Sequence, residues 1–251
     1  MKVVKILGVA LALAFSAPAW SIGNLADLAV FDRSEGRSLP VHWHEGRAYV
    51  VGKPGNEYQV SVRIRRGEDL LAVMSVDGIN VVTGETASPQ QSGYVLSPWR
   101  ALEVKGWRKS LERTAAFYFT ELPESYAART GRPENVGVIG VALFKRKSTQ
   151  PPADISLLSR RGADEPATAP RAEAQGAAAE RDAKLGTGHG RSETSHARYV
   201  AFERASSAPA ETIAIHYDSY RNLVARGVIR EPRPPVPVPQ PFPGFVPDPQ
   251  G

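Results

Sequence analysis

The sequence predicts a mainly β protein organised around an antiparallel β-sandwich, either immunoglobulin-like or jelly-roll. Residues 41–147 hold about eight short apolar runs, turn residues recur roughly every 8 to 12 positions, and no long helical pattern separates the runs. A smaller β-β-α segment follows at 185–230. We expect it to dock on the sandwich, because about 45 residues bury too little apolar surface to fold alone.

The clearest strands lie early in the sandwich region. In residues 56–65, apolar side chains at 58, 60, 62 and 64 alternate with polar ones, which indicates a half-buried strand. Residues 70–76 are almost continuously apolar and predict a strand covered on both faces. Asp77-Gly78 then fits a two-residue hairpin, because both turn positions need a positive φ.

The remaining elements follow from shorter patterns. Further strands are expected at 47–51, 79–83, 93–96, 101–105, 114–120 and 136–144, with a short helix at 123–129. In the C-terminal segment we expect strands at 197–204 and 211–217 and a helix at 220–226.

The two ends and the middle of the chain differ in composition from these regions. Two lysines, an apolar run at 6–15 and Ala17-Pro18-Ala19 predict a signal peptide over 1–19, with cleavage after Ala19. Residues 148–184 are Ala-rich without an apolar stripe and predict a disordered linker. Residues 231–251 form a Pro-rich tail, also expected to be disordered.

The amino-acid composition limits where the protein is expected to be located and which partners it is expected to bind. The signal predicts a periplasmic or secreted protein, and no later run is long enough to span a membrane. The chain has no Cys, which excludes disulfides, thiolate metal sites and Cys nucleophiles. The net charge of +5 is spread along the chain without a basic block, so we expect no nucleic-acid partner. An envelope protein or a cell-surface polymer is the expected partner.

Several stretches together resemble a known family. They are GNEYQV (55–60), SVDGINVVTGETA (75–87), QSGY (91–94), GWRKS (106–110), AAFYFT (115–120) and YAARTGRPENVGVIGVALF (126–144), with an echo at 185–193. As a set, they resemble an uncharacterised family of exported proteobacterial proteins, over residues 46–144. The resemblance implies an exported β-rich protein of a Gram-negative bacterium. It implies no activity and no catalytic residue.

The first candidate site is the Gly- and His-rich loop at 186–196. Gly188 lets the backbone approach a ligand closely, and His189, Glu193 and His196 offer metal-ligating or acid–base groups. Their spacing matches no zincin helix, so a tight structural loop is the competing interpretation. The pair His42 and His44 lacks a third His on a nearby strand and favours a polar strand end instead.

The second candidate is a surface site at Trp107, Arg108 and Lys109. An aromatic ring beside two cations can bind an anionic or sugar ligand by stacking and charge. The competing interpretation is that Trp107 covers the sandwich core while both cations are solvated.

No nucleophile elbow or dinucleotide fingerprint occurs in the chain. The sequence therefore predicts an exported non-enzymatic protein with a binding or assembly role at the envelope, without a cofactor. A metal-binding protein or hydrolytic enzyme using loop 186–196 is the alternative. A structural subunit that engages its partner through the Pro-rich tail is a third hypothesis.

Overall fold

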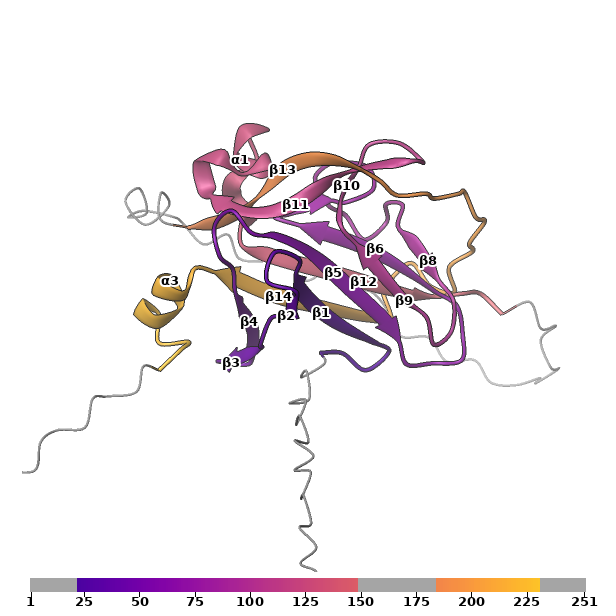
Figure 1. The fold of residues 1–251 in the computed structure, drawn as a ribbon. Helices are drawn as coiled ribbons and strands as arrows, with labels where there is room; N and C mark the ends of the chain where they lie inside the picture. The colour runs from indigo at the N-terminus through magenta and orange to yellow at the C-terminus, as the bar shows by residue number, and fades with distance from the viewer. Residues whose placement is uncertain (1–21, 149–183, 231–251) are drawn as a thin grey trace, which may run out of the picture.

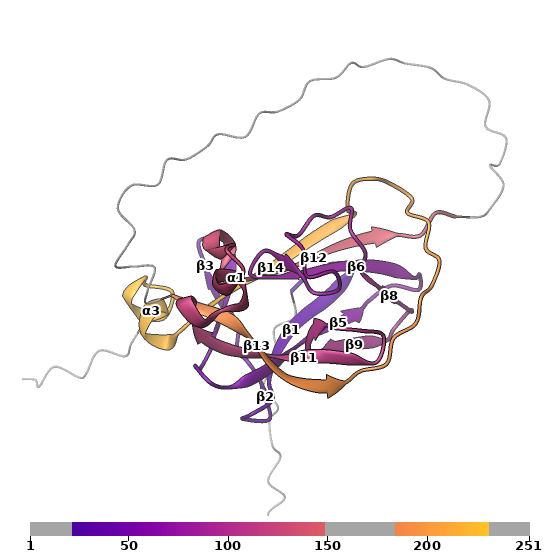
Figure 2. The ribbon, with the colours of Figure 1, turned by 90° about the horizontal axis from the view of Figure 1, so that it is seen from above.

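The computed structural model describes residues 22–148 and 184–230 (Figure 1). The predictions for the signal peptide, the Pro-rich tail and almost all of the linker lie outside these residues. Two sheets face each other around a shared apolar core, which confirms the predicted sandwich (Figure 2).

One sheet is antiparallel throughout, and we call it sheet A. Its central path runs β10-β11-β5-β1-β2, with β13 paired to β11 and β9 paired to β5. The strands are β1 (Ala26–Asp32), β2 (Arg37–Ser38), β5 (Glu57–Ile64), β9 (Ala101–Val104), β10 (Gly106–Arg108), β11 (Arg113–Glu121) and β13 (Leu185–Thr194).

The facing sheet, sheet B, is mixed. Its path runs β3-β4-β14-β12-β6-β7, with β8 also on β6, and only the β4–β14 pair is parallel. The strands are β3 (His42–His44), β4 (Arg47–Val51), β6 (Leu70–Val76), β7 (Ile79–Asn80), β8 (Tyr94–Leu96), β12 (Val138–Lys145) and β14 (Glu211–Asp218). A parallel pair needs a long crossover, and here most of the sandwich separates its two strands.

Within the described ranges, the helices are short. The segment predicted as a helix at 123–129 is split into η1 (Leu122–Glu124) and α1 (Tyr126–Arg129). Another single turn, η2 (Pro133–Asn135), precedes β12. The predicted C-terminal helix is α3 (Tyr220–Ala225), whose first turn is capped by the Ser219 hydroxyl.

The patterns in 56–80 are confirmed. Tyr58, Val60, Val62 and Ile64 are buried in β5, and every residue of β6 is buried except Ser75. Asp77 and Gly78 have φ of 52° and 72° and join β6 to β7 in a two-residue hairpin.

Both sheets take strands from outside residues 41–147. β1 pairs with β5 along its whole length, and β13 and β14 join opposite sheets. The strand expected at 197–204 does not form. Residues 195–204 instead run as an irregular segment, which we call the strap, along one open side of the sandwich (Figure 2). Near its end, Arg204 lies over the Phe144 ring, with 4.1 Å from Cζ to the ring centroid.

A buried polar cluster joins the C-terminal segment to both sheets. The Asp77 carboxylate accepts hydrogen bonds from Gly137 N (2.9 Å), Thr187 N (2.8 Å) and the Tyr217 hydroxyl. The Thr187 hydroxyl lies 2.6 Å from those of both Tyr58 and Tyr217. All of these side chains are buried, so each contact replaces water that the groups lost on folding.

This cluster makes stability depend on pH. Burial raises the pKa of Asp77 from 3.8 to about 6, although its hydrogen bonds oppose the shift. A raised folded-state pKa means that Asp77 favours folding fully below pH 3.8, and that this contribution is lost as the pH rises through 6. The loss amounts to about 3 kcal/mol, at 1.36 kcal/mol per pKa unit.

We therefore expect Asp77→Asn to remove this part of the pH dependence. Urea unfolding of both proteins at pH 4, 5, 6 and 7 measures it, because all other titrating groups are shared. The wild-type free energy of unfolding should fall by about 2.4 kcal/mol relative to the variant between pH 4 and 7, because part of the full loss has already occurred at pH 4. Parallel curves for the two proteins would contradict the assignment.

Candidate anion-binding cleft

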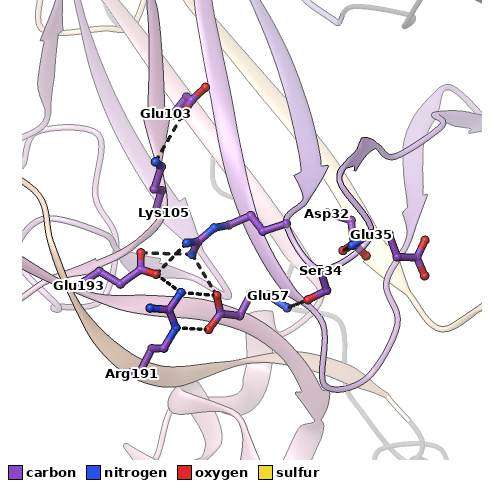
Figure 3. A network of polar contacts seen from close by, with 9 residues as sticks. Asp32, Ser34, Glu35, Glu57, Glu103, Lys105, Arg191 and Glu193 are labelled. Carbon is purple, nitrogen blue, oxygen red and sulfur yellow. Dashed lines mark hydrogen bonds and ion pairs between the residues drawn. The ribbon is translucent and has the colours of Figure 1, made fainter.

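Glu193 lies in a closed network of ion pairs rather than in an open site (Figure 3). The Arg33 guanidinium donates to both Glu193 oxygens at 2.7 and 3.2 Å, and Arg191 donates to both Glu57 oxygens at 2.7 and 3.0 Å. Arg33 also pairs with Glu57 and Arg191 with Glu193, at 3.3 and 2.5 Å. Two carboxylates thus alternate with two guanidiniums.

The ion pairs shift the pKa of two members of this network, Glu57 and Arg191. The hydrogen bond from Arg191 holds the pKa of Glu57 below its ordinary value, and the same contact raises the pKa of Arg191. The Glu193 side chain is only 11% exposed, and both of its oxygens are bound to guanidiniums. A carboxylate held in this way is poorly placed to bind a metal or accept a substrate proton.

The other members of the 186–196 candidate separate from Glu193. Gly188 lies under Tyr118, where a Cβ would approach the ring to 2.2 Å, so its role is close packing. His189 lies beside Tyr126, with ring centroids 5.4 Å apart, and partial burial lowers its pKa. His196 lies on the strap. Within residues 22–148 and 184–230, no three His, Cys, Asp or Glu side chains form a metal-binding group.

The three residues of the second candidate, Trp107, Arg108 and Lys109, do not form one site either. Trp107 is 3% exposed, and its ring centroid lies 5.1 Å from that of Phe117 and 5.0 Å from that of Tyr126. Its indole N–H donates to Gly188 O at 3.4 Å. Trp107 is therefore part of the core, whereas Arg108 and Lys109 line a cleft.

This cleft has a volume of about 1000 Å³. Its lining includes residues of β8, β9 and the strap. The strap is held at one end by Arg108, which donates to Ser195 O (2.6 Å) and Ser195 Oγ (3.0 Å). At the other end, Arg204 donates to Pro89 O and Gln91 O at 2.9 and 2.7 Å. The cleft is thus built from segments that are remote in sequence.

Cations outnumber acids in the lining of the cleft. The acids are Asp69 and Glu103, and the cations are Lys105, Arg108, Lys109, Arg146, Arg198 and Arg204. Arg146 pairs with Asp69 at 3.2 Å, and Lys105 pairs with Glu103 at 3.6 Å.

The other four cations have no carboxylate partner in the described part of the chain. Arg108 and Arg204 donate only to carbonyl and hydroxyl oxygens there, so their charge is positioned without being neutralised. Lys109 and Arg198 are exposed residues of the cleft lining, one directly after β10 and one on the strap. Fixed and uncompensated cations in a concave surface attract anions.

Two polar atoms of the lining residues add to this picture. Thr114 Oγ1 and Arg146 Nε are buried and have no hydrogen-bond partner among the described residues. Thr114 as a whole is only 2% exposed. Buried polar atoms are normally paired, because leaving one unpaired costs about 1–3 kcal/mol.

Of the candidate residues in the sequence, the structure thus brings Arg108, Lys109 and His196 into one lining. Sequence reasoning missed Arg146, Arg198 and Arg204, because they are single cations separated by long stretches. Arg198 and Arg204 lie within 197–204, where the apolar residues predict a strand and draw attention away from the two cations.

Comparison with known proteins identifies no relative: no family model, curated protein or solved structure matches the chain. The resemblance to an exported proteobacterial family therefore stays a prediction. Among the helices of the described residues, none is long and apolar enough to cross a membrane.

Proposed function

We propose that this protein is an exported, non-enzymatic binding protein that holds an anionic ligand in the cleft. The observation that carries the proposal is a group of four cations in the cleft lining that have no carboxylate partner within residues 22–148 and 184–230: Arg108, Lys109, Arg198 and Arg204. A negatively charged ligand would supply the counter-charges that the described part of the chain does not supply.

Export follows from the signal features of residues 1–19, and the periplasm or cell exterior is the proposed location. A cell-surface polymer or an envelope protein is then the proposed partner. Binding is favoured over catalysis because His196, in the described part of the chain, makes no hydrogen bond to a hydroxyl or carboxylate. A nucleophile activated by histidine requires that pairing.

Binding of dextran sulfate by the mature chain tests this function, with neutral dextran as the uncharged comparison. Lys109→Gln combined with Arg198→Gln removes two exposed cations of the lining. We expect this double variant to raise the Kd at low salt by about tenfold or more, since each charge-assisted contact is worth about 1.5–3 kcal/mol. Added salt should weaken binding by the wild type.

Arg66→Gln combined with Arg221→Gln is the matched control, because it removes the same charge from exposed positions outside the lining. Equal Kd values for the two double variants would mean that net charge, not the cleft, binds the polymer. Equal binding of dextran and dextran sulfate would overturn the proposal altogether.

A further inference from the structure

The cleft is lined by polar and aromatic side chains as well as by cations. These side chains indicate which kind of anion fits the cleft. Side chains with hydroxyl or amide groups are interspersed with the cations: Thr83, Gln90, Ser92 and Ser97. Such groups both donate and accept hydrogen bonds, which suits a ligand rich in hydroxyls. A simple inorganic anion only accepts hydrogen bonds, so it would use only the donor atoms of these side chains.

Aromatic side chains form a second feature of the lining. The Arg108 guanidinium carbon lies 5.6 Å from the ring centroid of Tyr94, and that of Arg146 lies 4.5 Å from the ring of Phe202. These two rings help to orient cations. Tyr199 is different, because it is 89% exposed and makes no ring contact in the described structure. Its face is available to stack against the flat apolar side of a ligand.

The size of the cleft argues for an oligomer. A volume of about 1000 Å³ lies at the upper end of ordinary small-ligand pockets, which range over about 300–1,000 Å³. A single phosphate, sulfate or monosaccharide would leave most of this space and most of the cations unused.

An acidic peptide fits the lining less well. Extended peptides gain affinity mainly through main-chain hydrogen bonds to a free strand edge. The strands that border the cleft are short, with three residues in β8 and four in β9, so neither offers a long edge to an extended peptide. Recognition here must come mostly from side chains, which favours a glycan over a peptide.

We infer that the ligand is an acidic oligosaccharide, whose carboxylate or sulfate groups pair with the cleft cations while a sugar ring stacks on Tyr199. This inference rests on the proposed function and specifies its ligand class.

Calorimetric titration of the mature chain with four probes of equal length tests the inference. They are hexagalacturonate, a sulfated heparin-derived hexasaccharide, neutral cellohexaose and hexaglutamate, which carries the carboxylates without the sugar. We expect one of the acidic glycans to bind at least tenfold more tightly than both hexaglutamate and cellohexaose. Tight binding of only one glycan assigns its acid group, carboxylate or sulfate, to the site.

Tyr199→Ala separates stacking from charge, and because the ring is 89% exposed its removal should leave the fold intact. We expect it to raise the Kd for the acidic glycan about three- to tenfold and to leave that for hexaglutamate within twofold. Tyr220→Ala is the matched control, because Tyr220 is 49% exposed and lies on α3 outside the lining.

If hexaglutamate binds as tightly as either acidic glycan, or if Tyr199→Ala changes neither Kd, the glycan assignment is overturned. The proposed function then still stands on dextran sulfate binding that depends on Lys109 and Arg198. If that binding also fails, both the ligand class and the function are wrong.

Discussion

Replacement of Asp77 by Ala is expected to lower the free energy of unfolding by about 3 to 5 kcal/mol at pH 5. The substitution leaves Gly137 N, Thr187 N and the Tyr217 hydroxyl without their acceptor in a buried environment. Each unpaired group costs about 1–3 kcal/mol, and partial rearrangement of Tyr217 toward Thr187 reduces the total. At pH 5 most of the folded-state carboxyl is protonated, so little relief comes from removing a buried charge.

Glu45→Ala provides a matched control for this experiment. Glu45 has φ of 49° and precedes Gly46 in the β3–β4 hairpin, so an Ala there meets the same backbone strain as at residue 77. Its side chain, however, is 84% exposed. Urea unfolding should show a loss of about 1 kcal/mol or less for Glu45→Ala. Similar losses for the two variants would mean that the turn conformation, and not the buried acceptor, stabilises the fold.

Local sequence patterns predicted those strands whose own residues alternate or form a continuous apolar run. β5 and β6 could be identified because alternation and a continuous apolar run are visible within a few residues, and Asp77-Gly78 because positive φ restricts the residue types. β1 was missed because its outward positions include Ala29 and Phe31, which blur the alternation with Leu28 and Val30. Its pairing with β5 is a long-range property.

In the C-terminal segment, the sequence pattern failed to predict β13 and wrongly predicted a strand at 197–204. β13 contains Gly186, Gly188 and Gly190, and glycines normally argue against a strand. They are tolerated here because side chains such as Tyr118 and Ser125 occupy the space where a Cβ would lie. The strap has apolar residues at 197 and 199–202, which predicted a strand. Within the described residues, its backbone pairs with the sandwich only at its two ends, where Ala197 N donates to Leu111 O and Lys147 N donates to Glu203 O, so no strand forms between them.

The two candidate sites likewise depend on contacts between residues that are far apart in the sequence. Arg108 and Lys109 could be singled out because they adjoin an aromatic residue, but their union with Arg198 and Arg204 depends on how the strap runs across the sandwich. Glu193 looked available in the sequence, because its partner Arg33 is 160 residues away. Charge compensation of this kind is visible only in the folded chain.

Gly106→Ala should lower the free energy of unfolding by about 3 kcal/mol or more. A Cβ at this position would lie 1.9 Å from the carbonyl oxygen of Ala115, 2.5 Å from its carbonyl carbon and 3.0 Å from the Cα of Ala116. These are backbone atoms of β11, which is paired with β10 here and with β13 at Ala115. Because they cannot rotate away, β10 and β11 must separate, and overpacking without room to relax costs at least the upper end of the usual 1–3 kcal/mol.

The same change should weaken binding in the cleft, because β10 carries Arg108 into the lining and Arg108 holds the strap at Ser195. Gly67→Ala is the control, since a Cβ there meets nothing within 4 Å and the turn needs no positive φ. Urea unfolding and dextran sulfate titration of both variants check the two effects. Gly106 lies where the chain passes from pairing with β5 to pairing with β11, and only a residue without a side chain allows that close approach. A Gly106→Ala protein as stable as Gly67→Ala would show that β10 can shift freely, and the position of Arg108 in the cleft could then not depend on it.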